Sequence, residues 1–467
     1  MKLKHIIPAA FLLLLSAVAC KKIEIKPTGQ VPPDQAIKNE ADVMANLNAT
    51  YTPLRGDNFW GGRSQVISEL MADFVDGSNF VSGDYPSIFT LNTTGTNGTI
   101  ANIYREPYII IQRANVTLDK LSLITAEATR KNAEGQAKFM RGFSAFELVK
   151  MFAQPWGYTA DNSHNGIVIK TNSEQELARS RNTVKETYDQ IILDLKEAET
   201  LLPATNGNFP TSWAAKAMLA RVYFQMNDFT NAYNYSNQVI ASGQFAFDNT
   251  ASFVTNRFSN PKTTEAIWWL VNETGPSAAP SFGTLRNNAN PFQSLGLPLT
   301  KEAYQAGTVN AADRRVAWYK DSLTASGTHI YSITKYKANI FVLPVLHITE
   351  MKLIRAESAA ELNQNLAVAI ADINDITNRA YGGTLTPLAG TATAAAVKAR
   401  VRAERKLEMV FESGDRLQQI KRIGAKGETV LVGQASWNCP GFVLQVPATE
   451  ISVNVNFQQN PQGGCSR

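Results

Sequence analysis

The sequence predicts a mainly α-helical protein whose helices pack in pairs, together with a loop-rich lobe that carries a few short strands. Small and apolar residues recur at helical spacing in residues 211–243, and Asn227-Asp228 divides this stretch into two runs. A second, looser pair is expected at 347–380. Such pairs are tetratricopeptide-like and cannot bury their apolar faces alone, so we expect neighbouring pairs to form one helical scaffold.

The first residues have the pattern of an export signal followed by a lipidated cysteine. Two early lysines precede an apolar run, Ile6 to Ala19, that is too short for a comfortable membrane span. Small residues stand directly before Cys20, as in bacterial lipoproteins, although a plain signal peptide cut near Cys20 is the alternative. We expect residues 1–19 to be a signal peptide and residues 20–33 to be a lipid-carrying tether.

Helical patterns then follow along the first half of the chain. We expect helices from near Asp34, at about Ser64 to Phe74, at 100–122 and at 126–153. Thr183 and Glu186 have the spacing of a capping box, which predicts another helix start, and Pro203 stops that helix. Residues 75–99 are crowded with Gly, Ser, Thr and Asn and predict a long loop, which is uncommon without a function.

The chain changes character near 245–260, where we place a boundary between regions 34–245 and 246–467. Short apolar runs between Pro, Gly, Asn and Ser clusters in 246–345 predict loops with a few strands. Residues 396–412 predict a further helix, and the tail from 425 is expected to be irregular.

Two cysteines remain in that tail. In an exported protein Cys439 and Cys465 are a plausible disulfide, and two unpaired thiols are the alternative.

The sequence carries no catalytic signature. The motifs G-x-S-x-G, G-x-G-x-x-G, the P-loop, H-E-x-x-H and C-x-x-C are all missing, and the 4 histidines stand singly. The formal charge of +5 is too mild and scattered for a nucleic-acid-binding protein. We therefore expect no enzyme activity, no cofactor, no metal and no nucleic acid.

A run of acidic and basic residues lies between Glu404 and Arg422. Glutamates four residues apart on a helix repel one another unless each has a partner, and arginines in the same run are ready donors. One interpretation is an anion site. The interpretation that we favour is a buried network of structural ion pairs.

Tryptophans divide into two groups. Three lie in apolar runs and are expected in the core: Trp213, Trp268 and Trp269. Four others stand at or near loops: Trp60, Trp156, Trp318 and Trp437. Such rings either stack on the apolar faces of a sugar or pin long loops onto the body of the protein.

The order of these features resembles the SusD/RagB family of surface lipoproteins of Bacteroidetes. Single motifs are weak, but their order along nearly the whole mature chain is specific. The matching stretches are Cys20, KPTGQ at 26–30, NEADVMANLNATY, Tyr108 with Ile111 and Asn115, AKFMRGFSAFELVKMFAQPWG with Arg141, RNTVKETYDQIILDLKEAETLLP, AAKAMLARVYFQMNDFTNA, EMKLIRAESAAE, ERKLEMVFESGDRLQQIKRIG, Val446-Pro447, Glu450, Asn456 and Gln459-Asn460-Pro461. Gln418-Gln419 and the closing QGGCSR depart from the family pattern.

The resemblance implies a non-catalytic protein held on the outer leaflet of the outer membrane by lipid on Cys20. It implies capture of an oligosaccharide, or in some members a peptide, and delivery to a SusC-like TonB-dependent β-barrel transporter. The helix-pair side is expected to pack on the barrel and the opposite loops to bind ligand. A surface glycan hydrolase and a scaffold without ligand are the alternatives.

Ligand-binding positions are assigned from loops, rather than from matched motif residues. The resemblance places a binding loop at about 73–90, and two further segments are chosen for their aromatic and polar side chains. The candidates are Asp76, Asn79, Phe80, Tyr85, Arg286, Asn287, Phe292, Trp318 and Tyr319.

Overall fold

The computed structural model describes residues 36–78, 80, 83–174, 178–271, 297–336 and 341–467. The expected signal peptide, Cys20 and the tether through residue 33 lie outside the described residues. Residues 39–467 form one compact unit, and the division at 245 stays a prediction. No helix in the part of the chain that the structure describes is both long and apolar enough to cross a membrane.

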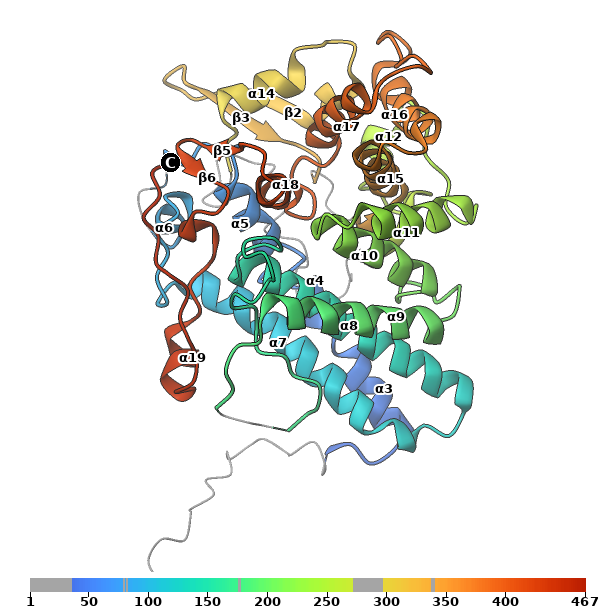
Figure 1. The fold of residues 1–467 in the computed structure, drawn as a ribbon, viewed down its shortest axis with the longest axis vertical. Helices are drawn as coiled ribbons and strands as arrows, with labels where there is room; N and C mark the ends of the chain where they lie inside the picture. Colours follow the sequence, from blue (N-terminus) through green and yellow to red (C-terminus); the bar gives the residue numbers. More distant parts are fainter. Residues whose placement is uncertain (1–35, 79, 81–82, 175–177, 272–296, 337–340) are drawn as a thin grey trace, which may run out of the picture. The chain divides into compact units, whose positions relative to one another are not determined.

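The predicted helices of the first half are confirmed. Long α7 (Gly98–Asp119), α8 (Glu127–Phe152) and α9 (Val184–Leu201) lie side by side, with α8 packed against both others (Figure 1). Thr183 and Glu186 form the predicted capping box at the start of α9. The shorter helices are α3 (Glu40–Asn48), α4 (Tyr51–Arg55), α5 (Arg63–Met71) and α6 (Tyr85–Phe89).

Both predicted helix pairs are present and are neighbours in space. The first pair is α10 (Ser212–Gln225) with α11 (Phe229–Ala241), and the second is α15 (Ile348–Leu362) with α16 (Leu366–Tyr381). Helix α11 packs on α15, and α17 (Ala394–Glu408) extends the array (Figure 1). Ala220 and Ala232 are fully buried, as close approach of two helices requires.

The strands form two-stranded antiparallel sheets. The pairs are β1 (Ala266–Val271) with β4 (Val342–His347), β2 (Tyr319–Leu323) with β3 (His329–Ile333), and β5 (Leu431–Val432) with β6 (Ala435–Ser436). The apolar runs of 246–345 predicted β1, β3 and β4 correctly, whereas β2 was not predicted. The expectation of an irregular tail from 425 is wrong where β5 pairs with β6. β4 leads directly into α15, which joins the loop-rich lobe to the helical scaffold.

Several short elements were not anticipated. Helix α6 interrupts the predicted loop 75–99, so that loop is shorter than expected. The other unanticipated elements are α12 (Phe253–Asn256), α14 (Lys301–Thr308), α18 (Asp415–Ala425), α19 (Ala448–Val453) and the 3-10 turns Leu121–Leu123, Arg314–Trp318 and Pro440–Phe442. Helix α18 begins after Gly414, whose φ is 61°. No side chain caps the start of this helix, so the sequence shows no helix-start signal there.

The buried ion-pair network is confirmed. Glu408 is fully buried, and its carboxylate accepts hydrogen bonds from Arg257 at 2.9 Å and from Arg379 at 2.9 Å. Arg315 donates to the same carboxylate at 3.2 Å and to Glu404 at 2.7 Å. Because these arginines come from separate segments, the network locks α17 to its neighbours, and the acidic run is structural.

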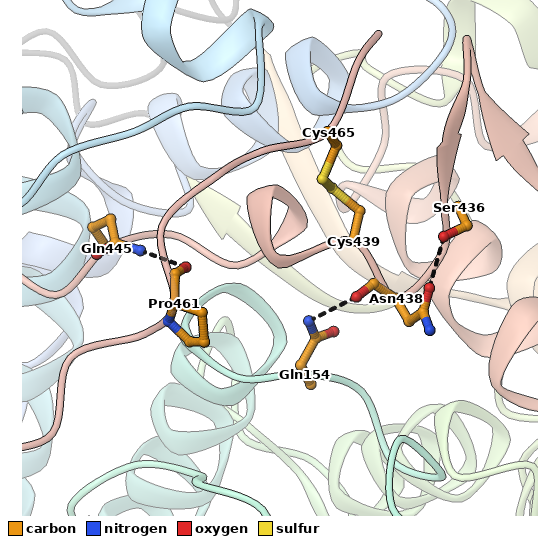
Figure 2. The surroundings of a disulfide bond; sticks show 7 residues. All are labelled: Gln154, Ser436, Asn438, Cys439, Gln445, Pro461 and Cys465. Carbon is orange, nitrogen blue, oxygen red and sulfur yellow. Dashed lines mark hydrogen bonds between the residues drawn. A yellow bond between two sulfur atoms is a disulfide. The ribbon is translucent and has the colours of Figure 1, made fainter.

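The two tail cysteines are joined. Of the two alternatives left open by the sequence, the structure has the disulfide between Cys439 and Cys465 (Figure 2). The surrounding tail is tied down as well, because the Gln445 side chain donates to the Pro461 carbonyl at 2.9 Å.

Candidate functional site

Trp318 is not an exposed ring. It is 2% exposed, and its indole nitrogen donates to the Val254 carbonyl at 2.8 Å. The ammonium group of Lys335 lies 3.9 Å from its ring centroid. The prediction that this ring is exposed for stacking on a ligand is wrong, because Trp318 fills core space beside the ion-pair network.

The other loop tryptophans also support the body of the protein. Trp60 is 1% exposed and packs against Phe143. Trp156 and Trp437 are half-buried. A Cβ at Gly424 would lie 2.1 Å from the Trp437 ring, so that helix glycine makes room for the indole. These contacts favour the interpretation that the rings pin loops.

The predicted binding loop joins the start of α14. The Asp76 amide donates to the Pro298 carbonyl at 2.8 Å, and the Thr300 amide donates to the Phe74 carbonyl at 2.9 Å. Val75 and Leu299 form a bridge between these bonds. The backbone thus places the loop that carries Asp76 directly beside α14, a contact between segments more than two hundred residues apart.

The remaining predicted ligand residues are placed as follows. Phe80 contacts Tyr85 edge-on with ring centroids 5.8 Å apart, and Tyr85 itself is buried. Tyr319 begins β2 and is half-buried. The other four, Asn79, Arg286, Asn287 and Phe292, lie outside the described residues.

An aromatic surface lies at α14, β2 and β3, and we define it as Tyr304, Tyr319, Tyr331 and His329. Tyr304 stacks on Tyr331 with centroids 4.3 Å apart. Tyr331 in turn lies parallel to His329 at 6.0 Å, and Tyr304 meets Tyr319 edge-on at 6.4 Å. The three tyrosines are half-buried and His329 is exposed, so the rings form a polar-rimmed stack open to solvent.

Local structure fixes these rings. His329 and Tyr331 are two residues apart on β3 and therefore share one face of the strand. Asp321 on β2 holds the His329 ring through Nδ1 at 2.8 Å. Gly307 on α14 lies against Tyr319, where a Cβ would come within 2.1 Å of the ring. Glycine at this position is therefore what lets α14 approach β2.

Tyrosine ionisation is suppressed at this surface. Burial, reinforced by the charge of Asp321, raises the pKa of Tyr304 above its ordinary value. Burial raises the pKa of Tyr319 as well. Both phenols therefore stay neutral over the physiological range and can donate as well as accept hydrogen bonds.

A cavity of about 230 Å³ adjoins the aromatic surface and shares Tyr319 with it. Its lining is mostly apolar: Phe74, Leu299, Ala303, Ala306, Leu407 and Val410. Lys406 adds one cation at the rim, with its ammonium 5.8 Å from the Phe74 ring. An apolar hollow with a few polar groups is the usual form of a small-molecule site.

A larger and more open groove, of about 570 Å³, runs along α9. Polar side chains dominate its described lining, which contains no aromatic ring. None of its described lining residues belongs to the predicted loop, and we assign the candidate site to the aromatic surface and its cavity. Among the described residues no group of three or more His, Cys, Asp or Glu side chains could hold a metal ion.

Comparisons with known proteins agree with this fold. Residues 30–224 match the SusD-like family model described as "Starch-binding associating with outer membrane". The chain is 30% identical over 245 residues to SusD-like protein P2 of Formosa agariphila, covering 52% of this chain and 46% of that protein. A SusD-like protein of Bacteroides ovatus is 25% identical over 155 residues, covering 32% of this chain and 26% of the relative. Over residues 30–224 this chain is therefore similar to SusD-like proteins.

Solved structures extend the likeness over about nine-tenths of this chain. A SusD superfamily protein from Bacteroides vulgatus superposes with a TM-score of 0.80 at 21% identity, covering 92% of this chain and 100% of that one. Surface glycan-binding protein A from Bacteroides uniformis gives a TM-score of 0.72 at 19% identity, covering 90% and 99%. At these identities the likeness shows the SusD fold alone. The curated relatives are matched over less than half their length.

Sequence reasoning missed Tyr304, Tyr331 and His329. The spacing of His329 and Tyr331 on one strand face was the available signal. Tyr304 gave none, because its stacking partner lies in another element.

Proposed function

We propose that this SusD-like protein captures an oligosaccharide at the cell surface and delivers it to a partner TonB-dependent transporter of the outer membrane, without changing it chemically. The observation that carries the proposal is the stack of Tyr304, Tyr331 and His329, open to solvent beside an apolar cavity. The family's association with starch binding and the outer membrane supports it.

The geometry suits a sugar ring. A pyranose offers apolar C–H faces, which pack on aromatic faces, and hydroxyl groups, which need hydrogen-bond partners. The neutral phenols supply both donors and acceptors, and the carboxylates of Asp76 and Asp321 add acceptors. Phe80 and Tyr319 stay proposed ligand residues on the same grounds, whereas Trp318 and Tyr85 are withdrawn because both rings are buried.

Surface anchoring is the second part of the proposal. The signal pattern and the small residues before Cys20 support a lipid anchor in the outer membrane. A mature chain held there by lipid can cap a SusC-like barrel while its loops face the medium.

Replacing Tyr331 by Ala should weaken oligosaccharide binding about tenfold, because it removes the central ring of the stack. Tyr331→Phe should retain most of the affinity, since it keeps the ring face. Isothermal calorimetry of each variant with the oligosaccharide that the wild type binds measures the change.

Tyr158→Ala is the matched control. This tyrosine is 41% exposed and contacts His164 and Trp437, which are not part of the aromatic surface. Equal affinities for wild type and Tyr331→Ala would remove the aromatic surface from the binding site.

A further inference from the structure

We call the segment 461–467 the strap. Its residues 462–467, QGGCSR, depart from the family pattern, and it has no role in the proposal above. The disulfide between Cys439 and Cys465 fastens it in the middle, and the Gln445 side chain holds its beginning through the Pro461 carbonyl (Figure 2). Asn460, directly before the strap, donates to the carbonyls of Phe152 at 2.9 Å and Leu444 at 2.8 Å. The disulfide and these hydrogen bonds thus hold the strap against the rest of the protein.

Arg467 carries the strap onto the predicted binding loop. Its guanidinium donates to the carbonyls of Leu70 and Ala72 and, at 3.3 Å, to that of Val75. It also donates to the Phe89 carbonyl at 3.1 Å. Three of these carbonyls lie at the end of α5 and the start of the loop that follows it, and the fourth is that of Phe89, the last residue of α6. One side chain therefore ties the start of the loop to the end of α6.

Contacts of the Phe89 ring connect Arg467 to the middle of the loop. The guanidinium lies 3.8 Å from the centroid of the Phe89 ring. The same ring packs on Gly77, where a Cβ would come within 2.3 Å of it. Gly77 stands next to Asp76, whose backbone joins the segment before α14. Contacts therefore run without a break from Arg467 through Phe89 to Asp76.

The strap also touches the segment that follows the loop. A Cβ at Gly463 would lie 2.6 Å from the side-chain oxygen of Asn92 and 3.1 Å from the Leu91 carbonyl. Gly463 and Gly464 have positive φ values of 20° and 90°. The double glycine lets the chain turn tightly against Leu91 and Asn92, which follow α6, just before the disulfide.

Electrostatics are consistent with a permanent contact. Burial lowers the pKa of Arg467 to about 10, and the charges of Asp73 and Asp76 oppose that shift. At neutral pH the guanidinium remains charged and keeps all its donors. Hydrogen bonds from a charged donor to neutral acceptors are among the stronger ones in proteins.

We propose that the strap is a positioning device for ligand binding: Arg467, held in place by the Cys439–Cys465 disulfide, fixes the loop that presents Asp76 and Phe80 to the ligand. This inference rests on the proposed function for the identity of the ligand, but the ordering of the loop stands apart from it. Arg467 acts through the loop and need not touch the ligand.

Amide hydrogen exchange without ligand tests whether Arg467 and the disulfide order the loop. The proteins compared are wild type, Arg467→Ala and the double variant Cys439→Ser with Cys465→Ser. In both variants the amides of 72–78 should exchange about tenfold faster or more, because a charged hydrogen-bond network is lost. Amides within α8 should be unchanged. Arg467→Lys should be intermediate, since one ammonium cannot span four carbonyls.

Arg105→Ala is the matched control, because Arg105 is 60% exposed and pairs only with Glu106 among the interactions of the described residues. Its loop exchange should equal that of wild type. Unchanged loop exchange in Arg467→Ala and in the cysteine variant would overturn the proposal. If one variant fails to fold, the other carries the test.

Titration with the oligosaccharide that wild type binds tests the effect of the strap on ligand binding. Arg467→Ala should bind about tenfold more weakly, while melting like wild type in the helical scaffold. Faster loop exchange with unchanged affinity would overturn the link between strap and ligand. A wild type that binds no oligosaccharide would instead refute the proposed function, and the exchange data would still decide the ordering of the loop.

Discussion

Replacing Glu408 by Gln lowers the free energy of unfolding by about 3–5 kcal/mol, because it leaves buried arginines without their shared partner. The carboxylate receives hydrogen bonds from Arg257, Arg315 and Arg379. An amide of the same size keeps the volume but loses the charge and offers one acceptor oxygen instead of two. Urea unfolding followed by circular dichroism measures the change.

Glu127→Gln is the control for that prediction. It is the same substitution in an ion pair with Lys131, but both side chains are largely exposed, at 67% and 56%. Water screens such pairs, so the unfolding curve should match that of wild type. If Glu408→Gln unfolded like this control, the network would not hold α17 in place.

Acidification should destabilise the protein by about 2–3 kcal/mol through this network. Neighbouring cations lower the pKa of Glu408 to about 2 from an ordinary 4.5, against the opposing effect of burial. Lys335 and Arg257 hold the pKa of Glu412 still further below its ordinary value. Both carboxylates have lower pKa values in the folded state, so their contribution is complete above pH 4.5 and is lost as the pH falls toward 2.

Protonation of Glu69 has the opposite effect on the stability of the fold. Glu69 is buried, neither oxygen has a hydrogen-bond partner among the described residues, and burial raises its pKa well above the ordinary value. Protonation therefore relieves this group as the pH falls. Urea midpoints between about pH 6 and pH 3 should decrease in wild type and decrease more steeply in Glu69→Gln, which removes the opposing group. Midpoints that stay level in both proteins would contradict the assignment.

Local signals account for the elements that were predicted correctly. Thr183 and Glu186 specify the start of α9 by contacts within four residues, and Ala220 and Ala232 mark the close approach of α10 and α11 within one pair. Helix α14 is short and contains Gly307, which weakens any helical pattern. This helix depends on its packing against β2, and that long-range contact cannot be read from the sequence.

The candidate site depended on long-range contacts, and sequence reasoning recovered it only in part. The loop that carries Asp76 was located through the family resemblance, whereas the Tyr304–Tyr331 stack requires α14 to pack on β3. Trp318 is the last residue of a 3-10 turn and directly precedes a strand. In the sequence this position looks like part of a loop, where an exposed side chain is expected. Its burial is set by Val254 and Lys335, both distant along the chain.

Calorimetric titration of the protein beginning after Cys20 against oligosaccharides and peptides, with every sample checked for products, is the most direct test of the central claim. The account predicts saturable binding of an oligosaccharide that is recovered intact. Cleavage of the ligand, or binding of peptides alone, would contradict it.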